Sequence, residues 1–435
     1  MTRSRLVASV FVALSIPSIA DAQAPTPSPT REDLAQAADA TAAVAAIPNG
    51  APAPVHAASD DIDLATLGLD PTSSGVDEKL NIYGFADIAY TMMHVETKTP
   101  YVPDTRGFSS GNLALYMSRN LSKQWRFLAE VRFLYLPNGA EGTDGKTTVT
   151  AAGDPTDFAR PVSWGGILIE RAYAEYDVND YLTVRAGRFL TPYGIWNIDH
   201  GSPAIIAVYR PYSIGEQYFP EHQTGLDLYG KVRLGVYQLA YHATVTNGRN
   251  PTEAISDPDM KLAFGGRVEL EAPWAGTLKL GLSGYAGQFT DVAPTLGAPT
   301  DSYKERSYAA DAQWDHGGLH VQSELIANEH HYLDGERALT TSGFAPDGRQ
   351  WGGYVLAGYR TDIAWNVMPY AYAETIHPID KSYYDHIYVG IGGLNFRPTS
   401  NVVLKVQYAH AVMREGTLLG NLDMDLVNTQ LAVVF

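Results

Sequence analysis

Hydrophobic and polar residues alternate along the chain over residues 80–435. In the clearest stretch, 125–135, every odd position is aromatic or aliphatic, whereas Arg126, Glu130 and Arg132 occupy even positions. A helix would scatter these three charges around its circumference, but a strand places them on one side. The alternation therefore predicts β-strands with one apolar face and one polar face.

We expect sixteen strands of this kind, and most of them are about ten residues long, the length that a tilted strand needs to cross a membrane. Beyond residue 22, no apolar run is long enough for a membrane-spanning helix. The predicted spans are 80–95, 111–121, 125–136, 166–177, 181–189, 224–234, 236–246, 262–271, 277–289, 306–315, 319–330, 351–361, 367–377, 385–396, 402–412 and 426–435.

Short and long connections alternate between these strands. They are short after even-numbered strands, such as 122–124 and 178–180, and mostly long after odd-numbered ones, such as 137–165 and 190–223. A membrane barrel with turns on one side and loops on the other produces this rhythm. Because backbone groups cannot stay unpaired in lipid, the sheet must close on itself. We therefore predict an all-β fold, a transmembrane antiparallel β-barrel over 80–435, with inner faces of mixed charge.

The first residues have the pattern of an export signal. Arg3 and Arg5 precede an apolar stretch over 6–16, which is too short to span a bilayer. Ala20-Asp21-Ala22 then fits the small-residue cleavage rule. The sequence predicts a signal peptide over 1–22, with an uncleaved anchor as the alternative.

An acidic segment interrupted by prolines follows over 23–79. This composition is typical of a mobile linker, which we expect in the periplasm. Thr30 and Asp33 suit the cap of a short helix over 34–46. Such a helix could instead pair between subunits, and the sequence leaves the two roles open.

The last predicted strand ends in an aromatic residue. Val427, Leu431, Val433 and Phe435 share one face of it. This arrangement resembles the C-terminal signature of bacterial outer-membrane barrels, which the barrel assembly machinery reads. The resemblance implies the Gram-negative outer membrane as the location, with lipid and lipopolysaccharide around the barrel.

Composition removes several classes of function. The formal charge of −17 argues against nucleic acid as a partner, because phosphate binding needs a basic face. The absence of cysteine excludes thiol nucleophiles and thiolate metal sites. Only 18% of residues are charged while 27 are tyrosines, a balance that suits strands with one face in lipid and aromatic girdles at its borders.

Other chemical motifs are weak. His330 and His331 are adjacent, so on a strand they point to opposite sides and cannot share a metal. Asp423 and Asp425 supply too few oxygen ligands for Ca²⁺. The glycines of 390–393 lie within a strand, where they ease curvature rather than bind a nucleotide. We expect no metal, no cofactor and no catalytic residue.

The longest connection, 190–223, joins the fifth and sixth predicted strands. It is rich in apolar residues, including Ile195, Trp196 and the run 204–208. Such a loop would be costly in water, and folding into the barrel interior would bury its apolar surface. We therefore expect this third long loop to fold inward and narrow the bore.

Polar residues of this loop would then face arginines of strands three to five. Acids on the loop opposite arginines on the wall would set up a field across the bore, which sorts solutes by charge and dipole. Some of these residues could equally form structural ion pairs that hold the loop in place. The predicted constriction residues are Arg126, Arg132, Arg171, Arg185, Arg188, Asp199, His200, Arg210, Glu216 and Glu221, with His222 beside them.

Two neighbouring segments carry a family resemblance. Ala172-Tyr-Ala-Glu-Tyr-Asp177, followed by Arg185-Ala-Gly-Arg188-Phe-Leu-Thr-Pro-Tyr-Gly194, resembles the hairpin and loop entrance of the phosphate-selective porin O and P family. The resemblance implies a sixteen-stranded, trimeric outer-membrane porin. Phosphate selectivity in that family depends on a ladder of basic residues, whereas acidic residues outnumber basic ones over 80–435. The sequence therefore supports the channel and not the phosphate preference.

The sequence thus predicts a homotrimeric porin, without enzymatic activity, for passive diffusion of ions and small hydrophilic solutes. Whether it prefers anions is left open. The alternatives are a structural or ligand-binding outer-membrane barrel and an outer-membrane lipid hydrolase.

Overall fold

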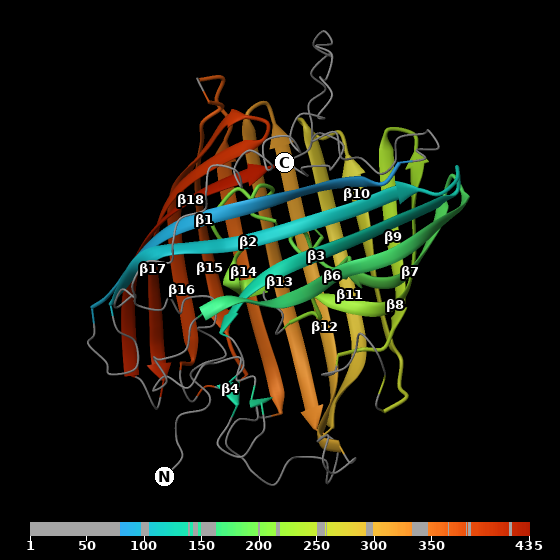
Figure 1. Cartoon of the computed structure of the whole chain (residues 1–435), viewed down its shortest axis with the longest axis horizontal. Helices are drawn as coiled ribbons and strands as arrows, with labels where there is room; N and C mark the ends of the chain where they lie inside the picture. The colour runs from blue at the N-terminus through green and yellow to red at the C-terminus, as the bar shows by residue number, and fades with distance from the viewer. Residues whose placement is uncertain are drawn as a thin grey trace, which may run out of the picture.

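Sixteen antiparallel strands close into a single barrel in this computed structural model (Figure 1). The predicted signal peptide, linker and helix over 34–46 lie outside the described residues. The structure describes residues 79–96, 104–137, 140–141, 147–148, 162–198, 201–214, 218–249, 257, 259–292, 299–332, 347–363, 365–379, 381, 384–416 and 420–435.

Each of the sixteen predicted strands has a counterpart in the barrel. Two further short strands, β4 (Ala140–Glu141) and β5 (Thr147–Thr148), pair with each other in a connection that the sequence presented as a loop. The barrel strands are β1 (Asn81–Val95), β2 (Thr105–Asn120), β3 (Trp125–Pro137), β6 (Val162–Asn179), β7 (Leu182–Leu190), β8 (His222–Leu234), β9 (Tyr237–Thr246), β10 (Ala263–Ala272), β11 (Thr277–Val292), β12 (Pro299–His316), β13 (Leu319–Tyr332), β14 (Gly348–Tyr359), β15 (Met368–His377), β16 (His386–Thr399), β17 (Val402–Gly416) and β18 (Gly420–Val434).

The first and last strands close the barrel. β1 pairs with β18 along eleven residue pairs, from Phe85–Val434 to Val95–Met424. Next to the pair Phe85–Val434, the amide of Gly84 donates to the carbonyl of Phe435 at 2.8 Å, and the amide of Phe435 donates to the carbonyl of Gly84 at 2.9 Å. The terminal residue of the chain is therefore part of the seam, and no open edge is left between β1 and β18.

Alternation separates the two faces of each strand. On β13, Gln322, Glu324 and Asn328 are buried inside the barrel, whereas Leu325 on the outer face is 57% exposed. Exposed aliphatic residues recur on the outside of other strands, including Leu282 and Val355. A wide belt of exposed apolar side chains is stable in lipid rather than in water. Among the described residues, no helix is long and apolar enough to cross a bilayer.

The inner face is not of mixed charge all the way round, which the sequence had led us to expect. From β14 through β18 to β1 it carries a large apolar cluster, which includes Leu356, Ile391, Met413 and Met424. Strands such as β16 are thus apolar on both faces. The expectation was wrong for this sector, because another segment of the chain covers it in place of water.

Candidate functional site

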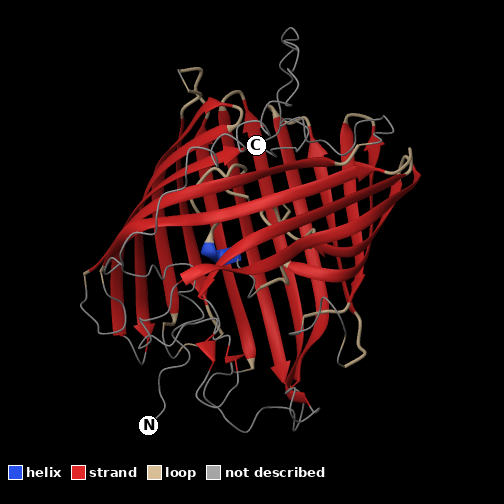
Figure 2. Ribbon diagram, viewed as in Figure 1, coloured by secondary structure: helices blue, strands red, loops and turns tan. Residues whose placement is uncertain are grey.

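The connection between β7 and β8 runs through the barrel interior. Along its course the amide of Gly194 donates to Ser283 Oγ at 3.2 Å, the indole of Trp196 to Tyr354 Oη at 2.5 Å, and the amide of Val208 to Gln407 Oε1 at 3.0 Å. These partners lie on β11, β14 and β17, far around the barrel from β7. The short helix η1 (Tyr212–Ile214) of this connection is drawn in blue within the barrel (Figure 2). We call the described part of this connection, 191–198, 201–214 and 218–221, the inner loop, and its predicted inward fold is confirmed.

Apolar residues of the inner loop cover the apolar sector of the wall. Trp196, Ile205, Ile206 and Ala207 are buried in the same cluster as the inner faces of β14–β18 and β1. Burying apolar area contributes about 25 cal/mol for each Å² removed from water. The loop and this sector therefore form a packed core inside the barrel, and any open bore lies toward the opposite wall.

Two glutamates hold the backbone of the inner loop. Glu324 Oε1 accepts from the amide of Ile195 at 2.8 Å, and its Oε2 accepts from Tyr354 Oη at 3.0 Å. Glu374 Oε2 accepts from the amide of Ser213 at 2.9 Å. Because both carboxylates are buried, they bind amides that would otherwise be unsatisfied. These two glutamates therefore make structural contacts that fix the loop, rather than contacts that select solutes.

The start of the inner loop depends on a tyrosine. The Tyr193 hydroxyl lies 2.7 Å from Thr244 Oγ1, and its ring packs against Phe219 and Tyr285. Burial raises the pKa of the Tyr193 phenol, so the hydroxyl stays protonated across the physiological range. This contact ties the loop entrance to β9 and to its own return segment.

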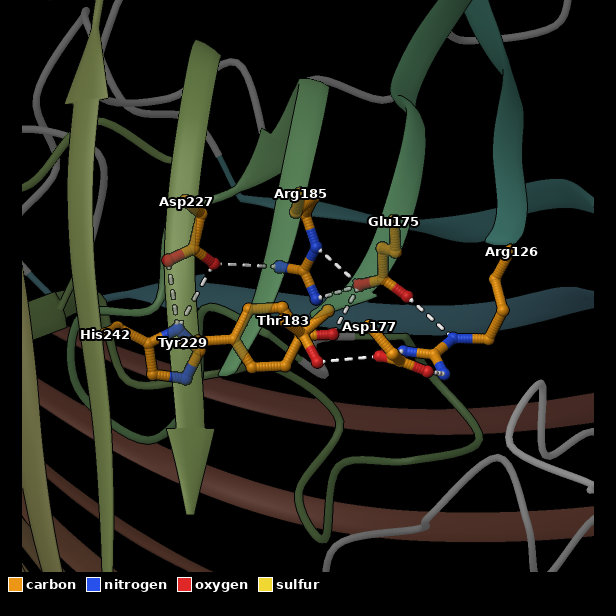
Figure 3. Close-up of polar contacts among 8 residues, drawn as sticks. All are labelled: Arg126, Glu175, Asp177, Thr183, Arg185, Asp227, Tyr229 and His242. Atoms are coloured by element: carbon orange, nitrogen blue, oxygen red, sulfur yellow. Dashed lines mark hydrogen bonds and ion pairs between the residues drawn. The ribbon is translucent and has the colours of Figure 1, made fainter. Parts of the chain in front are cut away.

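On the opposite wall, arginines and carboxylates alternate from strand to strand (Figure 3). Arg126 on β3 binds Glu175 at 3.2 Å and Asp177 at 2.5 Å. Arg185 on β7 binds the same Glu175 at 2.8 Å and Asp227 on β8 at 3.3 Å. Each charge in this row is thus compensated by a neighbour on the wall itself.

Arg185 is held by two aromatic rings and two carboxylates. Its guanidinium lies 4.6 Å from the ring centre of Tyr173 and 4.8 Å from that of Tyr229, while both of its edges bind carboxylates. These two cation–π contacts add to the ion pairs. With these contacts saturated, Arg185 organises the wall and has little capacity left to bind a passing solute.

A second row lies closer to the long connections. Arg171 Nε donates to Glu130 Oε2 at 2.6 Å, and Arg132 Nη1 donates to Glu170 Oε1 at 2.7 Å. His222 contacts the other oxygen of Glu170. Four wall arginines therefore stand among five wall carboxylates: Glu130, Glu170, Glu175, Asp177 and Asp227.

The remaining predicted constriction residues are not gathered in one place. Arg210 binds Glu221 at 2.8 Å, an ion pair within the inner loop itself. Arg188 lies on the other side of β7 from Arg185, with its Nε donating to the carbonyl of Ile169 at 2.9 Å. Three further predicted residues, Asp199, His200 and Glu216, lie outside the described residues.

Several site residues were not among those predicted. Glu175 and Asp227 occupy polar positions of strands with clear alternation. Their inward direction could therefore be predicted from the sequence, but the residues with which they form ion pairs could not. Glu324 and Lys405 gave no signal as loop anchors, because their role depends on contacts with the loop more than a hundred residues away.

The expected opposite directions of His330 and His331 are found, with His330 buried and His331 exposed. Within the described ranges, no group of three or more His, Asp or Glu residues could hold a metal.

Known proteins resemble this chain mainly in fold. No family model matches the sequence. An uncharacterized protein of Aquifex aeolicus is 30% identical over 129 residues, an alignment that covers 25% of this chain and 28% of that protein. The chain thus matches less than a third of that relative's length.

Solved structures share the fold at low sequence identity. OprB of Pseudomonas putida has a TM-score of 0.54 and 11% identity, with 82% of this chain and 94% of that chain covered. An anion-selective porin of Comamonas acidovorans has a TM-score of 0.52 and 12% identity, covering 82% and 99%. OmpF of Salmonella typhi has a TM-score of 0.50 and 12% identity, covering 82% and 98%. The chain has the fold of a porin-like outer-membrane β-barrel.

Gly194 provides a test of the loop entrance. It has a φ of +73°, and a Cβ there would lie 2.1 Å from Glu324 Oε1. We predict that Gly194→Ala breaks the bond between Ile195 and Glu324, destabilises the fold by about 1–3 kcal/mol and accelerates amide exchange at Ile195. Hydrogen exchange read by mass spectrometry measures this effect.

Gly235→Ala is the matched control. Gly235 has a φ of +67°, but a Cβ there would meet nothing within 4 Å. This variant shares the backbone strain and lacks the clash, so exchange at Ile195 should stay unchanged. Equal exchange at Ile195 in both variants would contradict the proposed role of Gly194.

Proposed function

We propose that this protein is an outer-membrane porin for passive diffusion of ions and small hydrophilic solutes. The observation that carries the proposal is the inner loop, which packs on an apolar sector of a sixteen-strand barrel and faces a charged wall. A barrel of this width has room for water as well as for one loop. The loop narrows the bore, so solute size becomes the first basis of selection.

Charge selectivity in this proposal is weak. Each of the four wall arginines binds a carboxylate of the same wall, and Arg185 is also enclosed by two tyrosines. A phosphate ion would have to displace these carboxylates to reach the guanidinium groups. We therefore propose a general channel without phosphate preference, even though the loop entrance resembles the phosphate-selective family.

The cellular setting belongs to the same proposal. We propose that the long connections face the cell exterior, that residues 23–79 form a periplasmic linker after cleavage of the signal peptide, and that three copies assemble. Lipid and lipopolysaccharide would contact the apolar outer belt. The barrel assembly machinery would recognise the strand that ends in Phe435, whose place in the seam supports this role.

A conductance measurement tests the proposal. Purified protein added to a planar bilayer should produce stepwise current increases in the nanosiemens range, because a water-filled bore conducts ions. A structural or ligand-binding barrel would give no steps. A lipid hydrolase would need a nucleophile and a base at the lipid boundary, and would release fatty acid from detergent-solubilised lipid. The absence of current steps would therefore overturn the porin proposal.

Neutralising wall arginines tests the charge balance of the bore. We predict that replacing three wall arginines with glutamine (Arg126, Arg132 and Arg171) shifts ion preference toward cations. The reason is that each substitution removes the arginine partner of one carboxylate, those of Asp177, Glu170 and Glu130 respectively. The zero-current potential in a KCl gradient measures the shift.

Arg188→Gln is the control, because Arg188 lies on the opposite face of β7. It removes one positive charge from the barrel but none from the wall rows, so its zero-current potential should match that of the natural protein. An unchanged potential in the triple variant would show that these arginines do not line the conducting path.

A further inference from the structure

One lysine inside the barrel binds only the inner loop. Lys405 on β17 is 1% exposed. Its Nζ donates to the carbonyl of Ser202 at 2.6 Å and to that of Ala207 at 2.8 Å. Both carbonyls belong to the inner loop, about two hundred residues earlier in the chain. Among the described residues, no carboxylate forms an ion pair with this ammonium group.

Neighbouring side chains bind the same stretch of loop backbone. On β16, Asn395 donates to the carbonyl of Ile206 and Arg397 to that of Pro203, each at 2.9 Å. On β17, Gln407 accepts from the amide of Val208 at 3.0 Å. Asn395 lies directly beside Lys405 in the register of the two strands. The wall thus binds four carbonyls and one amide of the segment 202–208.

The cost of burying this cation points to a specific role. An ammonium group transferred out of water is strongly destabilising unless hydrogen bonds replace its hydration. The inner-face neighbours of Lys405 on β16, β17 and β18 are buried and uncharged: Asn395, Val403, Gln407 and Gln430. Another aliphatic residue would pack there without this cost. Two charge-assisted bonds to the loop are what offsets the burial of Lys405.

We propose that Lys405 is the positioning residue that fixes the segment 202–208 of the inner loop and thereby sets the width of the bore. This inference rests on the proposed porin function. Without the ammonium group, the carbonyls of Ser202 and Ala207 would lose the donor that they share. The segment would then leave the wall part of the time, and the cross-section of the bore would fluctuate.

Three variants test the role of Lys405. Lys405→Met keeps the volume and removes both the charge and the donors, whereas Lys405→Gln keeps donor hydrogens without the charge. Lys304→Met is the control, because Lys304 lies on β12 with its side chain exposed. Each variant is measured by single-channel recording and by hydrogen exchange of the peptide that contains Val208, whose amide reports directly on the contact with β17.

We expect Lys405→Met to accelerate exchange at Val208 about tenfold, because a loss of about 1.4 kcal/mol from two buried hydrogen bonds shifts the opening equilibrium by that factor. We also expect larger mean conductance and about twofold greater open-channel noise, since the freed segment no longer holds one width. Lys405→Gln should restore part of both properties, and Lys304→Met should behave as the natural protein.

Two readouts keep this inference separate from the porin proposal. Unchanged exchange at Val208 in Lys405→Met would overturn the anchoring role, even if the natural protein conducts. Faster exchange with unchanged conductance and noise would overturn the role in setting the bore. If the natural protein gives no current, the porin proposal fails, and the exchange measurement still decides whether Lys405 anchors the loop. If Lys405→Met does not fold, the same comparisons are made with Lys405→Gln.

Discussion

A sheet that crosses a membrane must satisfy every backbone hydrogen-bonding group within itself, and the rest of this structure follows from that requirement. Closure of β1 onto β18 meets it, down to the bonds between Gly84 and the terminal Phe435. Sixteen strands, however, enclose an interior too wide for their own side chains to fill. The protein fills part of that interior with the inner loop, whose backbone in turn needs partners on the wall.

The inner loop divides the barrel interior into two different environments. From β14 to β1 the wall carries the apolar cluster that packs against the loop, and buried polar residues such as Glu374 and Lys405 bind loop amides and carbonyls. From β3 to β8 the wall carries paired arginines and carboxylates. Because the loop is attached to one side, the charged side is free to line a bore. The attachment of the loop to the apolar sector thus explains both where the loop lies and why the bore would be charged.

Alternation together with the rhythm of short and long connections was enough to predict all sixteen barrel strands, even where a strand such as β16 is apolar on both faces. The apolar content of 190–223 was likewise enough to predict an inward loop. The pairing of charges was not predictable, since it depends on register across strands. A bulge between Glu130 and Val131 shifts the pairing of β3 with β6, and both Glu170 and Arg171 are therefore buried although they are adjacent. Strict alternation would have placed them on opposite faces.

The central claim is that the inner loop occupies the bore and limits conduction. It is tested most directly by the single-channel conductance of a variant that lacks residues 202–208 and carries Lys405→Met, so that no buried cation is left unpaired. The account predicts discrete current steps that are larger than those of the intact protein, because the segment no longer fills the bore. Steps of the same size in both proteins would show that the loop lies outside the conducting path and would contradict the account.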